Sequence, residues 1–289
     1  MDTVKYKQGL ASFSIVTNAC ATDDIRIIPI VESWLRVFGN RVKEILIIID
    51  NNTPSGRIAR LHGDLGSLEK ILAAVQILKL NDSRVKSVML PHHAECQRSL
   101  SGWFAGAPIP HRCQAGTPVL PFVYAMEQGS QDLVLRVDCD MVFYENGFLE
   151  NAFSLMSADG CDLLEPFRWD QADQGGLVST RALFFSPAGF KKNCLPLRHA
   201  KLDIARSVHR LFKGLPREMA LETTLSKEKI NGKIRHSVMN KNYGWSLHFG
   251  KRSDFLIKNI EDIIKQVEAG NLTNKQITQG PNFIPDAWL

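Results

Sequence analysis

The sequence predicts an α/β fold in which a mostly parallel central sheet is flanked by helices. Runs of consecutive aliphatic residues, such as the segment 45–49, are typical of strands that are buried on both faces, as in parallel sheets. These runs alternate with segments whose apolar residues recur at helical spacing. Alternation of this kind favours strand–helix–strand units with right-handed crossovers.

The first strand is predicted at 12–17, and it leads into a polar loop at 18–24. A helix follows the loop, because Pro29 suits a first helical turn. Four apolar residues fall on one face of this helix: Val31, Trp34, Leu35 and Phe38. Gly39 and Asn40 mark its expected end.

The second strand, at 44–50, ends in Asp50 and is followed by the turn-rich segment 51–56. A helix at about 67–80 and a short strand at 85–90 form the next unit. Strand, helix, strand and helix therefore succeed one another along this part of the chain. That order predicts neighbouring parallel strands.

The irregular stretch 91–118 contains residue types that bind zinc. They are His92, His93, Cys96, His111 and Cys113. Their spacing matches no common structural zinc pattern, and an irregular loop over the sheet accounts for them without a metal. Zinc binding and a plain loop both stay open.

Beyond Pro187 the pattern changes to helices and short strands. The remaining predicted helices lie at about 121–128, 147–157, 201–212, 217–230 and 257–268, and the remaining strands at 133–137, 161–165, 177–186, 233–238 and 245–249. The sequence shows no internal repeat or low-complexity segment. The 289 residues are therefore expected to form a single domain with appendages.

Composition narrows the class of protein. With 44% hydrophobic residues the chain can bury a sizeable core, but its longest apolar runs are far shorter than the roughly 20 residues that span a bilayer. The segment 1–3 opens no signal peptide, so the expected location is the cytoplasm, either free or peripheral at the inner face of the membrane. The six cysteines are scattered, which favours reduced thiols.

The formal net charge of +5 is unevenly distributed. The segment 190–217 carries eight basic residues and one acid, Asp203, so it contributes +7 and leaves −2 for the rest. This local charge favours contact with an anionic substrate or an anionic membrane surface, or else belongs to a solvated face. Because the protein as a whole is not strongly basic, no nucleic-acid partner is expected.

Asp138, Cys139 and Asp140 directly follow the apolar strand at 133–137. Two carboxylates one residue apart at the exit of a strand can both reach one divalent cation, because the chain there no longer alternates strictly between faces. Ligands of open α/β sheets bind at the carboxyl ends of such strands. The pattern predicts a metal held against phosphate oxygens, and the alternative is a plain surface turn.

The order of these segments resembles the GT-A class of nucleotide-sugar glycosyltransferases, most nearly the family 2-like group. The matching segments are 14–18 for the first strand and base-binding loop, 47–51 for the second strand, 134–140 for the metal motif, 222–226 with 231–235 for the helix of the catalytic acid, and 245–248 for a late metal or diphosphate contact. The order and spacing of the motifs carry the resemblance, which spans about residues 12–250.

The resemblance implies one GT-A domain over residues 1–289. Its nucleotide-sugar-binding half is expected at about 12–165, and an acceptor-side region of helices and strands, with the catalytic acid, at about 166–250. A C-terminal helix and tail at 251–289 complete the chain.

The resemblance also implies a metal and nucleotide site. Asp140 is the first ligand of Mn²⁺ or Mg²⁺, Asp138 shares the metal or contacts the ribose, and His248 completes the shell. The residues expected to contact the nucleotide are Thr17, Asn18, Asp50 and Asp138.

The implied reaction transfers a sugar from a UDP- or GDP-sugar to a hydroxyl of a glycan, a lipid-linked or a small-molecule acceptor. Inversion needs a base for the acceptor proton, and Glu222 is the first candidate. The family usually has an adjacent Glu-Asp pair here, whereas Leu221 precedes Glu222 in this chain and Glu218 lies one turn earlier. The sequence therefore leaves open which glutamate is the base, and whether the reaction inverts or retains the configuration of the sugar.

Other classes of protein fit parts of the pattern. Asp138 followed by Cys139 and Asp140 also suits a phosphatase or phosphomutase of the haloacid dehalogenase type, with Asp138 as nucleophile. A sugar-phosphate nucleotidyltransferase is a further alternative, although no glycine-rich phosphate loop follows the first strand. The last alternative is a noncatalytic module that binds a sugar or a nucleotide.

Overall fold

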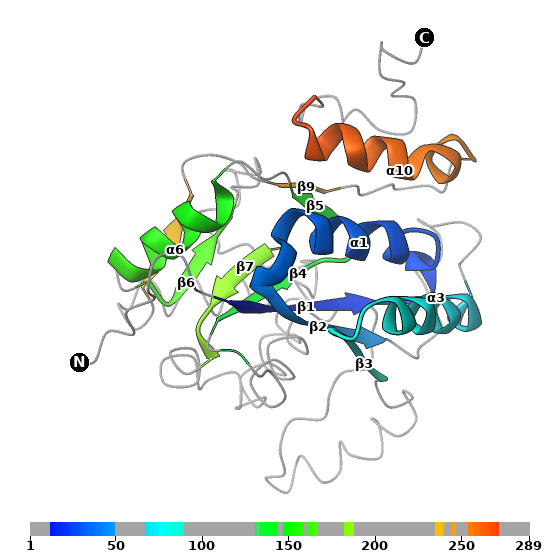
Figure 1. The fold of residues 1–289 in the computed structure, drawn as a ribbon, viewed down its shortest axis with the longest axis horizontal. Helices are drawn as coiled ribbons and strands as arrows, with labels where there is room; N and C mark the ends of the chain where they lie inside the picture. The colour runs from blue at the N-terminus through cyan, green and yellow to red at the C-terminus, as the bar shows by residue number, and fades with distance from the viewer. Residues whose placement is uncertain are drawn as a thin grey trace, which may run out of the picture.

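The computed structural model describes residues 12–49, 67–89, 131, 133–143, 147–158, 161–166, 182–187, 235–239, 244–246 and 254–271. Its helices are α1 (Ile27–Phe38), α3 (Leu68–Asn81), α6 (Phe148–Ala158) and α10 (Asp254–Glu268), with the short 3₁₀ turns η1 (Ala21–Asp23) and η2 (Gly39–Arg41). Its strands are β1 (Phe13–Ala19), β2 (Val42–Ile49), β3 (Val85–Met89), β4 (Val134–Val137), β5 (Met141–Phe143), β6 (Leu163–Glu165), β7 (Ala182–Phe185), β8 (His236–Val238) and β9 (Gly244–Ser246). Figure 1 shows their arrangement.

The described strands form a seven-stranded sheet in the order β3-β2-β1-β4-β7-β6-β8. The pairs β1–β2, β2–β3, β1–β4 and β6–β8 are parallel, and β7 runs antiparallel to both of its neighbours, β4 and β6. A separate antiparallel pair consists of β5 and β9. The predicted fold class, an α/β fold with a mostly parallel sheet and flanking helices, is confirmed.

The strands β1 and β2 lie in the interior of the sheet, and β2 contains the aliphatic run 45–49. The parallel register pairs Ile15 with Ile45 and Val16 with Leu46. The side chains at 45–49 are at most 3% exposed. Burial on both faces removes the need for polar residues at alternate positions, which is why the segment 45–49 is aliphatic throughout.

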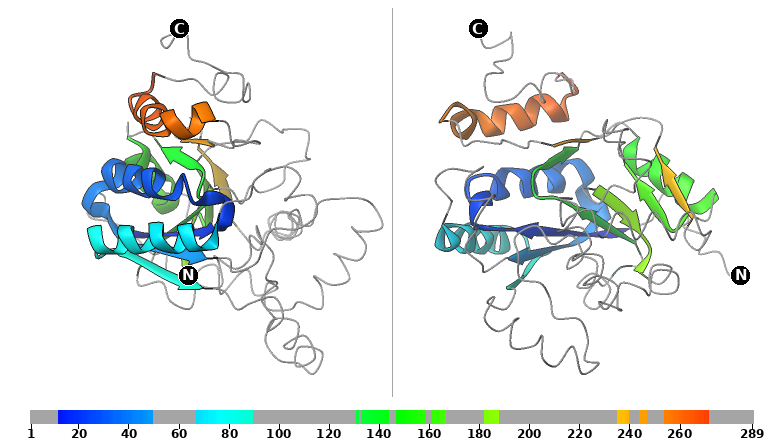
Figure 2. Two further views of the ribbon diagram at one scale, coloured as in Figure 1. Left: turned by 90° about the vertical axis from the view of Figure 1, so that its right-hand side faces the viewer. Right: turned by 180° about the vertical axis from the view of Figure 1, so that it is seen from behind.

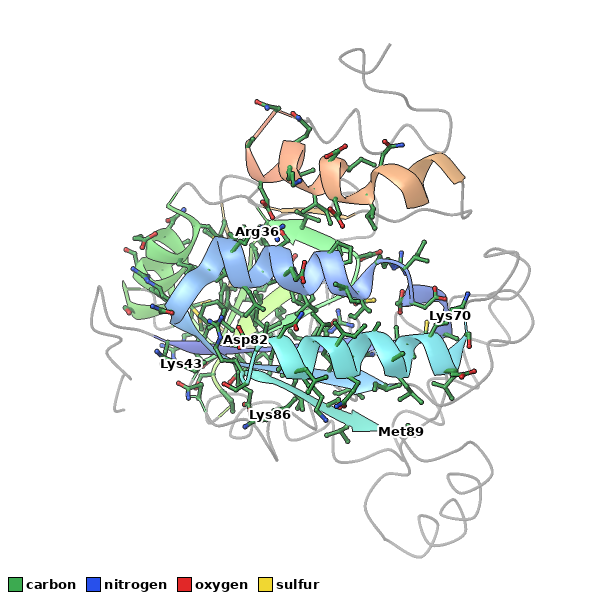
Figure 3. All side chains as sticks on the ribbon, turned by 45° about the vertical axis from the view of Figure 1, so that its right-hand side comes forward. Arg36, Lys43, Lys70, Asp82, Lys86 and Met89 are labelled. Atoms are coloured by element: carbon green, nitrogen blue, oxygen red, sulfur yellow. The ribbon has the colours of Figure 1, made fainter. Side chains whose placement is uncertain are left out.

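The described helices lie on one face of the sheet, as Figure 2 shows for α1 and α3. The core on this face combines residues of α1, including Ile30 and Trp34, with alternate residues of the strands, such as Ile15, Ile47 and Phe184. Next to α1 lies α10, and Arg36 of α1 forms an ion pair with Glu268 of α10 at 2.9 Å (Figure 3). The core is therefore built between the sheet and α1.

Aromatic rings join three elements within this core. Phe13 of β1 makes edge-to-face contacts with Phe38 of α1 and Phe184 of β7, at centroid separations of 5.4 and 5.3 Å. Such pairs contribute roughly 0.5–1.5 kcal/mol each beyond the area that they bury. They fix the position of α1 over the centre of the sheet.

The opposite face of the sheet carries a few polar side chains among apolar ones such as Val16 and Leu46. Glu44 of β2 accepts a hydrogen bond from Ser14 Oγ at 3.2 Å and lies 2.5 Å from Lys86 Nζ on β3. Glu44 is only 3% exposed, so these partners offset the cost of burying its charge. Lys86 lies at the outer edge of the sheet (Figure 3).

Two contacts to acidic side chains hold β8 against β6. The backbone N–H of Arg235 donates to Asp162 Oδ2 at 2.9 Å. His236 Nε2 lies 2.6 Å from Glu165 Oε1, and each of these two side chains is 4% exposed. Because β8 has only three residues, side-chain pairs add to the few backbone bonds that set its register.

Predicted and observed elements differ in detail. The helix α10 begins at Asp254 rather than near 257. The sequence pattern does not predict β5, because three residues are too few to show a strand period. The described part of the strand predicted at 177–186 is Ala182–Phe185.

Other predictions fall outside the described residues. These are the helices at 121–128, 201–212 and 217–230, the zinc-type residues at 91–118 and the basic segment 190–217. None of the helices in the described part of the chain is both long and apolar enough to cross a membrane.

Candidate functional site

The path of the chain across the sheet reverses between β1 and β4. From β1 the chain moves to β2 and β3 on one side, and β4 lies on the other side of β1. Ligands of open α/β sheets bind outside the carboxyl ends of the strands at such a point. The register pairs Val16 with Arg136 last, and Asn18 and Asp138 each follow two residues later, at this edge of the sheet.

A tight turn follows β4 at the same edge. The backbone N–H of Met141 donates to the carbonyl oxygen of Asp138 at 3.2 Å, which closes the turn over Cys139 and Asp140. The indole Nε1 of the fully buried Trp34 donates to the carbonyl oxygen of Met141 at 2.8 Å. The sheet thus holds the turn at its start, and α1 holds it at its end.

Asp138 is the more exposed of the two acids. Its Oδ1 lies 2.6 Å from Nη1 of Arg136, and its side chain is 36% exposed, against 4% for Arg136. Residues two apart on a strand face the same side, which lets this pair meet along β4. The carboxylate is therefore accessible at the edge of the sheet while a buried cation holds one of its oxygens.

Asp140 is buried and lies near the start of α1, where its charge acts on Arg26. Asp23 joins them: it accepts from Arg26 Nε at 2.7 Å and from the backbone N–H of Cys20 at 2.8 Å. Burial works to lower the pKa of Arg26, but the negative charges of Asp23 and Asp140 help to outweigh it, so this pKa lies above its ordinary value. Arg26 is a fixed positive charge beside Asp140.

Cys139, between the two acids, is expected to resist alkylation. Burial raises the pKa of its thiol well above the ordinary range, and the negative charge of Asp23 adds to the rise. Because the thiolate is the reactive form, little of it is present even at a pH of about 9. Iodoacetamide labelling read by peptide mass spectrometry should modify the half-buried Cys20 much faster than Cys139. Equal rates would contradict this expectation.

The structure brings two of the predicted site residues, Asn18 and Asp138, to one edge. Thr17 is fully buried, and its hydroxyl lies 3.4 Å from the carbonyl oxygen of Asn18. Asp140 is in the same turn as Asp138 but is 7% exposed. The other predicted site residues lie outside the described residues: Asp50, Glu218, Glu222 and His248.

Three residues at this edge are not singled out by the sequence analysis. Arg136 is marked in the sequence only by being a charge within an apolar strand. Asp23 and Arg26 stand in a polar loop, where charged residues are ordinary. Their roles become visible only when the fold brings the start of α1 next to the turn after β4.

The chemistry of the edge fits a hard divalent cation. Carboxylate oxygens are ligands that Mg²⁺ and Mn²⁺ prefer, and Asp138 presents such a group with partial exposure. Within the described ranges, no three His, Cys, Asp or Glu side chains are grouped so as to hold a metal. Further ligands would come from phosphate oxygens, from water or from the rest of the chain.

No protein-family model and no curated protein matches the chain. Among solved structures, it is similar to S. aureus TarS 1–349 in complex with UDP-GlcNAc, with 15% identity over 92% of this chain and 69% of that chain and a TM-score of 0.48. The glycosyltransferase GlyE of Streptococcus pneumoniae is 12% identical over 80% of this chain and 45% of that chain, with a TM-score of 0.45. The mannosyltransferase PcManGT from Pyrobaculum calidifontis, in complex with GDP-Man and Mn²⁺, is 9% identical over 78% of this chain and 54% of that chain, with a TM-score of 0.46. The last two proteins are named as a glycosyltransferase and a mannosyltransferase.

Proposed function

We propose that the protein is a glycosyltransferase that moves a sugar from a nucleotide-diphosphate donor to an acceptor hydroxyl. The observation that carries the proposal is the partly exposed carboxylate of Asp138 at the reversal point between β1 and β4. Sheets of this kind bind nucleotides at that edge, and an acid there would hold a cation that offsets the charge of a diphosphate. A UDP- or GDP-sugar is the donor we expect.

The proposed donor site combines residues from several strands. Asp138 and Asp140 hold the cation, Mn²⁺ or Mg²⁺, and His248 is a further ligand by resemblance. A cation so placed stabilises the negative charge of the departing diphosphate. Asn18 lies at the end of β1, where it supports nucleotide binding, together with Asp50 by resemblance.

The proposed acceptor half rests on the sequence resemblance. Glu222, or Glu218 one turn earlier, accepts the proton of the acceptor hydroxyl in an inverting reaction. The acceptor is a glycan, a lipid-linked or a small molecule. The charge of the segment 190–217 supports an anionic acceptor or contact with an anionic membrane surface.

UDP or GDP is expected to bind only in the presence of a divalent cation. Calorimetric titration with Mn²⁺ should show binding that EDTA removes, because the acids at the edge repel a bare diphosphate. Asp138→Asn should weaken this binding about tenfold or more, since it removes a charged contact worth roughly 1.5–3 kcal/mol. Equal affinity for the nucleotide with and without metal would contradict the proposed role of the cation.

Asp82→Asn is the matched control. Asp82 also pairs with an arginine, Arg84, at 2.6 Å, but it directly precedes the short turn before β3, at the amino end of the strands (Figure 3). Its substitution should leave nucleotide binding unchanged. If both variants lose binding equally, the loss reflects general destabilisation and not the carboxyl edge.

Two further assays separate the alternative functions. Hydrolysis of simple phosphate esters would indicate a haloacid dehalogenase-type phosphatase, and pyrophosphate-dependent formation of a nucleoside triphosphate would indicate a nucleotidyltransferase. The structure disfavours Asp138 as a nucleophile, because Arg136 holds its Oδ1 at 2.6 Å. A carboxylate held in this way is a weaker nucleophile.

A further inference from the structure

Arg136 occupies a position at which the sheet alone calls for an apolar residue. Its register neighbours are Val16 of β1 and Leu183 of β7. β4 is buried along its whole length, and the Arg136 side chain is 4% exposed. A buried guanidinium in a central strand is strongly unfavourable unless it is paired, and a well-packed apolar side chain would usually serve stability as well or better. Departures of this kind from local rules concentrate at functional sites.

The partner of Arg136 lies in the candidate site. Nη1 of Arg136 reaches Oδ1 of Asp138 at 2.6 Å, and Asp138 is the acid with the greater exposure. The guanidinium therefore approaches the carboxylate from inside the sheet, while the solvent-accessible side of Asp138 faces the edge. One carboxylate oxygen is engaged before any ligand arrives.

We propose that Arg136 is a positioning residue that keeps the affinity of this edge for a divalent cation low until a nucleotide diphosphate is present. It holds Asp138 in one orientation and offsets its charge, so that cation and diphosphate bind together and not one by one. This inference rests on the proposed donor site. It concerns the order and coupling of binding, which that proposal leaves open.

Charge supports this role. Among the described residues, the structure pairs the negative charge of Asp138 with the positive charge of Arg136, so the two charges offset each other. Arg136 repels a cation that approaches Asp138 and attracts the diphosphate that comes with it. Loss of Arg136 removes the positive charge that offsets Asp138. A bare cation should then bind more tightly, and its dependence on nucleotide should decrease.

The test measures Mn²⁺ binding directly, by electron paramagnetic resonance of the free ion, in the full chain with and without UDP or GDP. Arg136→Met replaces the guanidinium with an apolar side chain that suits the neighbours Val16 and Leu183. We expect it to bind Mn²⁺ alone about tenfold more tightly than the unmodified protein, or more. Arg136→Lys retains the charge and should bind Mn²⁺ alone as weakly as the unmodified protein.

Circular dichroism and thermal melting establish that the variants fold. If Arg136→Met does not fold, the unmodified protein still tests the idea: a saturating nucleotide should tighten Mn²⁺ binding at least about tenfold, and no such coupling would overturn the proposal. Unchanged or weaker Mn²⁺ binding by a folded Arg136→Met would overturn it as well, because a purely structural arginine predicts that result.

The same titrations distinguish the two proposals. Nucleotide binding with Mn²⁺ in the unmodified protein, together with unchanged Mn²⁺ affinity in Arg136→Met, would leave the donor site standing and remove the role of Arg136. In the opposite outcome, Arg136→Met binds Mn²⁺ more tightly but no form of the protein binds nucleotide. That result would support the effect of Arg136 on cation affinity, and it would contradict both the donor site and the coupling to nucleotide.

Discussion

Replacing Glu222 with Gln is expected to lower turnover by about 10²- to 10⁴-fold while the donor still binds. Gln has the shape of Glu but cannot accept the acceptor's proton, so the loss should appear in kcat rather than in donor affinity. Steady-state kinetics with the donor sugar, alongside calorimetric titration of UDP or GDP, measure the two quantities separately.

Glu218→Gln is the matched variant, because the two glutamates are four residues apart in the predicted helix. A large loss in Glu218→Gln and none in Glu222→Gln would move the role of base by one turn. If neither variant loses activity, a retaining reaction or a base supplied by the substrate replaces the inverting mechanism.

Replacing Trp34 with Ala is expected to lower the free energy of unfolding by about 3–5 kcal/mol. Trp34 of α1 is fully buried, and its Nε1 donates to the carbonyl oxygen of Met141 at 2.8 Å. The change leaves a cavity and removes the indole N–H that donates to the carbonyl oxygen of Met141. Because domains of this kind are stable by only about 5–15 kcal/mol, urea denaturation should show a large shift of the midpoint.

Two controls separate the contributions of Trp34. Trp34→Phe keeps most of the ring and removes only the N–H donor, so it should cost about 1–3 kcal/mol. Leu80→Ala removes a side chain that is 76% exposed on α3 and should change stability by about 0.5 kcal/mol or less. If Trp34→Phe costs nothing, the hydrogen bond to Met141 does not hold the turn after β4.

The parallel part of the fold could be predicted because the composition of its strands indicates that they are buried on both faces. A run such as 45–49 has no polar position, and only a strand covered on both faces tolerates that. The reversed direction of β7 was not predictable in the same way. Its residues Ala182–Phe185 are equally apolar, and an apolar run does not reveal which way the strand runs beside its partner.

The candidate site shows the same division. Asp138 could be identified because it follows a buried strand at once, and the end of such a strand is a place where ligands bind. The difference in exposure between Asp138 and Asp140 could not be predicted, since it depends on Arg136 within the sheet and on Arg26 at the start of α1. These contacts join residues that are distant in the chain, and the local sequence pattern does not predict them.

The central strand β1 acquires its two neighbours at very different times. β2 follows it closely in the chain, whereas β4 comes much later, and the hydrogen bond between Ser12 and Gln131 at 2.8 Å spans 119 residues. A growing polypeptide therefore carries β1 with one row of unpaired N–H and C=O groups until β4 has left the ribosome. Pairing over so long a loop is slow, which prolongs the period in which this strand can associate with other chains. Since Asn18 lies on β1 and Asp138 directly follows β4, the edge that carries both residues does not exist in the nascent chain until that pairing is complete.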